Sequence, residues 1–251
     1  MKIGIKKGKA LEGMREAGRV AAEVLRVCRN AVMPGITTRD IDAICLETAH
    51  SLGAESSTKG YLGFPGSLCV SVNEEVIHGI PGPRVIRLGD IVSLDVTVNI
   101  GGYHGDNAVT VAVGEIPPDT QELLDVTKRA LVAGIAAAKP GRHLSDVSAA
   151  VETVARAGRC GVVRDFVGHG IGRKMHEEPP VPNFGRPGRG PILEPGMTIC
   201  IEPMLTRGTH KVDVLEDGWT VVTHDGLPAA HFEHTVLITE SGAEVLTPRE
   251  D

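Results

Sequence analysis

The sequence predicts an α+β fold made of two similar halves that face each other, with a functional site at their junction. Three observations support this prediction. Segments with helical periodicity precede β-branched, strand-like runs, this order occurs twice along the chain, and individual residues of the first copy recur in the second. We therefore expect a single domain over residues 1–251, with pseudo-repeat halves of about 1–118 and 119–251.

The first half begins with a predicted helix over residues 11–31, where apolar residues recur at helical spacing up to Met33-Pro34-Gly35. A second helix is expected after Thr37, a candidate N-cap with Asp40 three residues later. Strand-like runs follow at residues 68–72, 90–100 and 108–113. Pro117-Pro118 then marks a break, because proline interrupts both helices and sheet ladders.

The second half repeats this order, with helices predicted over residues 120–138 and 145–157 and strands over 197–201, 219–223 and 232–239. The segment ending at Asp95 resembles the one ending at Glu202, and His104-Gly105-Asp106 aligns with His231-Phe232-Glu233. Acidic residues therefore fall at equivalent places in both halves. A duplicated fold with a site between its copies is the simplest interpretation.

Composition and charge exclude several classes of protein. The net charge of −6 disfavours a protein devoted to nucleic acid, and the absence of a long apolar run disfavours a membrane span. The N-terminal segment, with Lys2, Lys6, Lys7 and Lys9, does not have the pattern of a secretory signal and is expected to be solvated. Five cysteines without CxxC spacing favour a reducing cytoplasm over a disulfide framework. With 3% aromatic residues, the core must consist of Val, Ile, Leu and Ala.

Four acidic residues lie in strand-like, Val/Ile-rich segments: Asp95, Asp106, Glu202 and Glu233. Strand alternation places Asp95 opposite an apolar face, and nothing basic is patterned against the four. Any one of them alone would be read as a solvated strand residue. Because a buried carboxylate is costly unless it is neutralised, four in matching positions favour metal binding, and two divalent cations would balance their charge.

One histidine fits this ligand set. Gly168-His169-Gly170-Ile171-Gly172 surrounds His169 with glycines, which prevent a helix and let the backbone approach another segment closely. These glycines do not form a dinucleotide-binding motif, because the segment leads to Pro179-Pro180 instead of a helix. Carboxylates with one imidazole suit Mn, Fe, Co or Zn. Glu177 and Glu178 are interpreted as a solvated pair.

The order Asp95, Asp106, His169, Glu202, Glu233 resembles the ligand set of the pita-bread metallopeptidases. The sequence segments around His78, His169 and Trp219 resemble those of type I methionine aminopeptidases in particular, and the match covers nearly the whole chain. This resemblance implies a curved antiparallel sheet covered by helices, with no N-terminal zinc-finger extension. It also implies two divalent cations (Co, Mn, Fe or Zn).

In this family, Asp95 would hold one cation, His169 and Glu202 the other, and Asp106 and Glu233 both. A hydroxide activated by the two cations would attack the scissile carbonyl, with Glu202 accepting the proton of the water. The resemblance assigns His78 to the substrate near the scissile amide and His176 to the carbonyl oxygen. His78, His176 and Glu202 are therefore the candidate catalytic residues.

The resemblance also implies a pocket for one methionine side chain, formed by Tyr61, Phe64, Cys69, His78, Met175, His176, Met204, Trp219 and His231. Phe64, Met175 and His231 depart from the residues common in the family. A monovalent-cation site for Na or K would use Asn73 with the carbonyls of Glu75 and Ala229.

The function implied is removal of the initiator methionine from nascent proteins whose second residue is small. The expected protein is cytoplasmic and monomeric, makes transient contact with the ribosome, and binds no specific nucleic acid or membrane. Two alternatives remain. One is a pita-bread hydrolase of the Xaa-Pro aminopeptidase or prolidase type, which usually carries an additional N-terminal domain. The other is a non-catalytic binding protein on the same fold.

Overall fold

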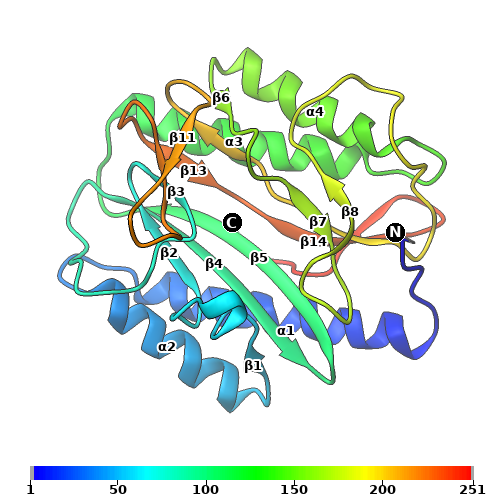
Figure 1. Cartoon of the computed structure of the whole chain (residues 1–251), viewed down its shortest axis with the longest axis horizontal. Coiled ribbons are helices and arrows are strands. Elements are labelled where there is room, and N and C mark those ends of the chain that lie inside the picture. The colour runs from blue at the N-terminus through cyan, green and yellow to red at the C-terminus, as the bar shows by residue number, and fades with distance from the viewer. Residues whose placement is uncertain (1–2, 250–251) are drawn as a thin grey trace.

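The computed structural model describes residues 3–249 (Figure 1). Its helices are α1 (Lys9–Ala31), α2 (Thr38–Ser51), α3 (Pro118–Ala137) and α4 (Leu144–Ala157), with a 3₁₀ turn η1 (Tyr61–Gly63). Its strands are β1 (Glu55–Ser56), β2 (Cys69–Val72), β3 (Glu75–Ile77), β4 (Ile91–Ile100), β5 (Tyr103–Ala112), β6 (Gly161–Val162), β7 (Gly168–Gly170), β8 (Glu177–Val181), β9 (Thr198–Ile201), β10 (Met204–Thr206), β11 (Val212–Val214), β12 (Val221–Thr223), β13 (Ala229–His231), β14 (His234–Ile238) and β15 (Ala243–Val245). Within this range, none of the helices is both long and apolar enough to cross a bilayer.

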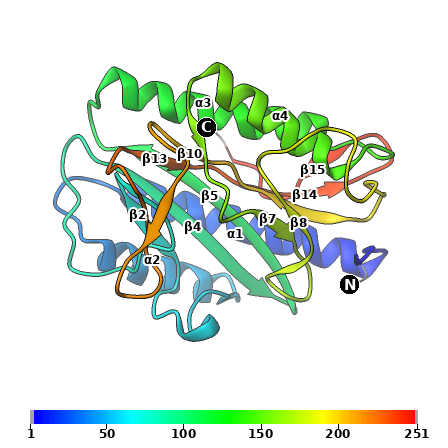
Figure 2. The same cartoon turned by 45° about the horizontal axis from the view of Figure 1, so that its top comes forward.

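The strands lie between two helix pairs, with α1 and α2 on one side and α3 and α4 on the other (Figures 1 and 2). Two sheets build the centre. One joins β1, β4, β2 and β5, and the other has the order β15-β14-β9-β7-β8. Two smaller sheets, β13-β10-β6 and β11-β12-β3, flank them. All described strand pairs are antiparallel, which agrees with the predicted α+β class.

Local signals predicted the helices well. The Thr37 side chain accepts a hydrogen bond from Asp40 N (3.2 Å), and the Asp40 carboxylate accepts one from Thr37 N (2.9 Å). This capping box satisfies two N–H groups that the first turn of α2 leaves free. The core is likewise built mainly from Val, Ile, Leu and Ala, as the low aromatic content requires.

Three strand predictions need correction. The run at 108–113 belongs to β5, which begins at Tyr103 because Gly101 and Gly102, with positive φ, form a tight turn after β4. The predicted strand 232–239 shortens to β14, because Phe232 and Glu233 form the break between β13, which pairs with β10, and β14, which pairs with β9. The predicted strand 219–223 shortens to β12.

The segment after His169 also differs from expectation. Gly168–Gly170 forms β7, and the proline-containing segment forms β8 at the edge of its sheet, where a missing N–H is tolerated. Glu177 is not solvated: it forms an ion pair with Lys6 (2.8 Å), and the two side chains are 20% and 10% exposed. The prediction of a solvated N-terminal segment is therefore wrong at Lys6, whereas Lys2 lies outside the described residues.

Helix α1 lies directly on β5 because Gly105 has no side chain. A Cβ at Gly105 would lie 2.3 Å from the carbonyl oxygen of Ala17 in α1. We expect Gly105→Ala to lower the free energy of unfolding by about 1–3 kcal/mol, the usual cost of overpacking. Chemical denaturation measures this. Gly82→Ala is the control, since its Cβ would have ordinary contacts, and equal stability of the two variants would contradict the prediction.

Candidate functional site

Asp95 and Asp106 lie on the same face of the β4–β5 hairpin. In the register of this pair, Asp95 is opposite Ala108 and Asp106 is opposite Thr97, so the two acids are diagonal neighbours. Asp106 Oδ1 accepts a hydrogen bond from Thr97 Oγ1 at 2.8 Å. Asp106 is 5% exposed, so this hairpin buries a carboxylate in the middle of a sheet.

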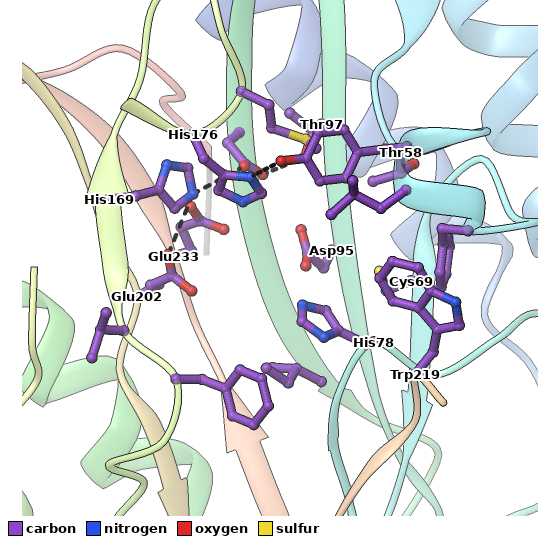
Figure 3. Close-up of a pocket in the computed structure, with 18 residues that line it drawn as sticks. Thr58, Cys69, His78, Asp95, Thr97, His169, His176, Glu202, Trp219 and Glu233 are labelled. Atoms are coloured by element: carbon purple, nitrogen blue, oxygen red, sulfur yellow. Dashed lines mark hydrogen bonds and ion pairs between the residues drawn. The ribbon is translucent and has the colours of Figure 1, made fainter. Parts of the chain in front are cut away.

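The other three predicted ligands lie on or next to adjacent strands. His169 is on β7, Glu202 follows β9, and Glu233 precedes β14; these strands are hydrogen-bonded neighbours. Glu233 N donates to Ala108 O on β5 (2.9 Å), which joins this group to the β4–β5 hairpin. The structure thus brings all five predicted ligands to the lining of one cavity (Figure 3).

The breaks between strands determine the positions of two of these acids, Glu202 and Glu233. Glu202 and Pro203 separate β9 from β10, and Phe232 and Glu233 separate β13 from β14. At each break the chain leaves one partner strand and begins to pair with another. The acidic residue at the break therefore does not occupy a regular position in a sheet. Glu202 is 9% and Glu233 2% exposed.

Burial and mutual repulsion dominate the electrostatics. Burial raises the pKa of Asp95, and burial together with the charge of Asp95 raises the pKa of Asp106 well above its ordinary value. Burial followed by the charge of Asp106 does the same to the pKa values of Glu202 and Glu233. Without a counter-charge, the protein therefore opposes ionisation of its own cluster.

His169 presents one nitrogen to the acids. Its Nδ1 lies 2.9 Å from Gly170 O, and because a carbonyl only accepts, Nδ1 carries the proton. Nε2 therefore has its lone pair free, 3.6 Å from Glu202 Oε1 and 3.7 Å from Asp106 Oδ2. Burial, followed by the nearby His176, lowers the pKa of His169 to about 3, so the ring is neutral.

These residues fit a divalent metal centre. Glu202 Oε1 and Glu233 Oε1 are buried without a hydrogen-bond partner, and no Lys or Arg is among the described residues that line the cavity. One ligand atom each from Asp106, His169, Cys200 and Glu233 lies within 4.8 Å of the others. Cations would supply the missing partners and favour the ionised carboxylates.

No role at the site was predicted for Cys200, yet this residue lies beside the acids. Its Sγ is 3.6 Å from Thr235 Oγ1 on β14. Burial, followed by the charges of Glu233 and Asp106, raises the pKa of this thiol well above its ordinary value. Strand alternation between Thr198 and Glu202 was the available signal, because it places Cys200 on the face of the acids.

The cavity of about 290 Å³ has an apolar end opposite the acids. Phe64 and Trp219 meet edge to face with centroids 5.2 Å apart, and Tyr61, Cys69 and Met175 also line it. Further lining residues were not predicted: Thr58, Leu62, Ile77, Thr97, Phe166 and Val167. They come from segments whose approach to the cavity depends on the tertiary fold.

His78 and His176 flank the cavity from different elements (Figure 3). His78 lies edge-on to Phe166 (5.6 Å) and Trp219 (6.2 Å), and burial lowers its pKa to about 4. His176 Nδ1 is 2.9 Å from Tyr61 Oη, and burial also lowers the pKa of His176. Both rings are therefore neutral near pH 7.

Two predicted pocket residues lie behind this lining. Met204 is fully buried in an apolar cluster with Val76 and Ile77, and Ile77 itself faces the cavity. His231 is 1% exposed, and its Nε2 is 3.7 Å from Glu202 Oε2.

The residues predicted for a monovalent cation lie around one turn. Asn73, with φ 60°, accepts a hydrogen bond from Ile91 N through its side chain and one from Ala229 N through its carbonyl oxygen (both 2.9 Å). Glu75 accepts from Val72 N at 2.7 Å.

Comparisons with known proteins agree with this geometry. The model of metallopeptidase family M24 matches residues 12–240. The chain is 49% identical to methionine aminopeptidase 1 of Bacillus subtilis over 234 residues, which is 93% of this chain and 94% of that protein.

A solved structure of a methionine aminopeptidase is likewise similar to this chain. The methionine aminopeptidase of Thermotoga maritima superposes with a TM-score of 0.97 at 46% identity, covering 99% of this chain and 100% of that one. Prolidase from Pyrococcus furiosus, at 23% identity and a TM-score of 0.80, shares the fold over 98% of this chain and 66% of its own. These likenesses confirm the predicted pita-bread fold. With its buried cluster of acids and one histidine, the chain belongs to metallopeptidase family M24.

Proposed function

We propose that this chain is a metal-dependent aminopeptidase that removes N-terminal methionine from polypeptides whose second residue is small. The observation that carries the proposal is the cavity itself, which joins an apolar end to the five predicted ligand residues, three of them buried. An unbranched thioether side chain suits the end lined by Phe64, Met175 and Trp219. The relatives named above are methionine aminopeptidases, which supports the same reaction.

Asp95, Asp106, His169, Glu202 and Glu233 would hold two divalent cations. When bound, these cations would polarise the scissile carbonyl and increase the acidity of a water molecule. Glu202 Oε1, which is buried without a hydrogen-bond partner, is suited to accept a proton from that water.

The two neutral histidines would orient the substrate. If the Tyr61 hydroxyl donates to His176 Nδ1, the single proton of the ring lies on Nε2, from which it would donate to the carbonyl oxygen of the scissile amide. His78, held between Phe166 and Trp219, would contact the amide from the opposite side of the cavity.

The remaining expectations extend this proposal. The cations would come from Co, Mn, Fe or Zn, and the turn at Asn73 would bind Na or K. All five cysteines are free, which supports a reducing compartment such as the cytoplasm. We further propose that the protein is a monomer that contacts the ribosome transiently as it meets nascent chains. The halves 1–118 and 119–251 would be copies of one ancestral unit, which the two helix pairs support.

Peptide hydrolysis tests the proposal. We expect the metal-loaded protein to release methionine rapidly from Met-Ala-Ser and only slowly from Met-Lys-Ser, because the proposed function requires a small second residue. Free methionine is measured by chromatography. Equal rates on both peptides, or hydrolysis of neither, would contradict the assignment. Cleavage of Ala-Pro instead would favour a prolidase-type activity.

A further inference from the structure

The segment of residues 172–177, called the loop below, lies between β7 and β8, ends on the first residue of β8, and carries two residues of the cavity, Met175 and His176. Gly172 N donates to Lys174 O (3.1 Å), and Lys174 N donates to the Glu177 side chain (3.2 Å). The loop thus depends on a side chain, that of Glu177, for part of its shape. A contact that fixes the position of Glu177 therefore also restrains the neighbouring His176.

Lys6 is the residue that binds Glu177. Its Nζ lies 2.8 Å from Glu177 Oε2, and both side chains are mostly buried. The pair packs against Gly172, where a Cβ would lie 2.6 Å from Glu177 Oε1 and 2.7 Å from Lys6 Cε. Only a glycine leaves room for this ion pair beneath the loop. Because the pair is largely shielded from water, it is less screened than a surface pair.

The N-terminal segment holds Lys6 in place. Lys6 N donates to Gly196 O (2.8 Å), and a Cβ at Gly196 would lie 2.7 Å from Lys6 O. Ile3 packs on the main core. Lys6 is therefore an anchored donor that reaches Glu177 across 171 positions of sequence.

The other end of the loop is held independently. Arg173 donates to Tyr103 Oη (3.0 Å), and its guanidinium lies 4.3 Å from the centre of the Tyr103 ring. Gly172 O accepts from His104 N (2.9 Å). With this end fixed to β5, the end of the loop beside His176 is held by the Lys6–Glu177 pair and by the pairing of Glu177 with Gly170.

We propose that Lys6 is a positioning residue of this enzyme: by binding Glu177, it orients His176, and with it the hydrogen bond to the scissile carbonyl. The proposal rests on the aminopeptidase function above. Lys6 itself is not among the residues that line the cavity. It acts through Glu177 and the loop.

The test compares Lys6→Met, which keeps the length of the side chain but not its charge, with Lys6→Arg. We expect Lys6→Met to lower kcat for Met-Ala-Ser by about 10- to 100-fold, the usual effect of displacing a catalytic group by up to an ångström. KM and the metal content should change little, the melting temperature should fall because Glu177 loses its partner, and Lys6→Arg should recover most of the activity and of the stability. Arg15→Met, which breaks the exposed Arg15–Glu244 pair (2.8 Å), is the matched control and should keep wild-type kcat.

Glu177→Gln tests the same ion pair from its other side chain. It should reproduce the loss seen in Lys6→Met, and the double variant should be no worse than either single one, because both remove the same interaction. Unchanged kcat in Lys6→Met, additive losses in the double variant, or a loss accompanied by lower metal content would overturn the proposal.

Hydrogen exchange separates this proposal from the proposed function. Whatever the protein hydrolyses, Lys6→Met should speed amide exchange in residues 172–177 and leave β4 unchanged. Unaltered exchange in the loop would refute the positioning role. An inactive wild-type protein with faster loop exchange in the variant would instead refute only the aminopeptidase function.

Discussion

Asp106→Ala is expected to lose its bound divalent metal and to lower the hydrolysis of Met-Ala-Ser by about 10³-fold or more, since a metal contributes several kcal/mol to such reactions. Asp106 raises the pKa values of both Glu202 and Glu233, and it interacts with Asp95. It therefore neighbours every other acid of the cluster. Its removal should disturb both cation positions, which metal analysis after dialysis and peptide turnover would measure.

The metal-free form of this variant provides a further check. Because Asp106 adds negative charge to a buried acidic cluster, its removal should leave the melting temperature of the metal-free protein unchanged or higher. Added Mn²⁺ should raise the melting temperature of the wild type more than that of the variant. Glu240→Ala, which removes an exposed acid, is the control and should bind metal normally. A full metal complement in Asp106→Ala would exclude the proposed centre.

His176→Ala is expected to lower kcat for Met-Ala-Ser by about 10²- to 10³-fold, the usual cost of losing a donor to a developing oxyanion. The ring of His176 lies against that of His169, with centroids 4.4 Å apart, but its Nδ1 faces Tyr61. Its proposed partner is the substrate, so metal content should equal that of the wild type. Steady-state kinetics and metal analysis on the same preparation measure both quantities.

Tyr61→Phe tests the orientation of this histidine. It keeps the ring that lines the cavity but removes the hydroxyl beside His176 Nδ1. A smaller loss of kcat than in His176→Ala is expected, because the imidazole remains as a donor. The loss of one metal equivalent in His176→Ala would show that His176 is a ligand and would contradict the assignment to the carbonyl oxygen.

Short-range patterns were sufficient to predict many of the elements. Thr37 and Asp40 cap α2 as predicted, because a capping box involves only four consecutive residues. Alternation in β4 correctly placed Asp95 on the face opposite Val92 and Leu94, since successive residues of a strand point to opposite sides. The glycines around His169 also behave as expected: a Cβ at Gly170 would lie 2.1 Å from Glu178 O.

Contacts between residues far apart in the sequence were harder to predict. The strand predicted over residues 232–239 begins only at His234, because the chain changes its partner strand between β13 and β14, and strand partners are not encoded in local periodicity. The pairing of Lys6 with Glu177 was missed for the same reason, because two isolated charges distant in sequence usually lie in solvent.

The sequence by itself determined the five candidate ligand residues and their order, the helices and the aliphatic core, all of which depend on residue identity and on neighbours a few positions away. Only the tertiary structure decided the convergence of those ligands, the place of Cys200 beside them, and the anchoring of the His176 loop by Lys6. The physical reason is that burial and strand pairing arise from packing the whole chain. A carboxylate becomes costly, and hence in need of a cation, only when distant segments exclude water from it.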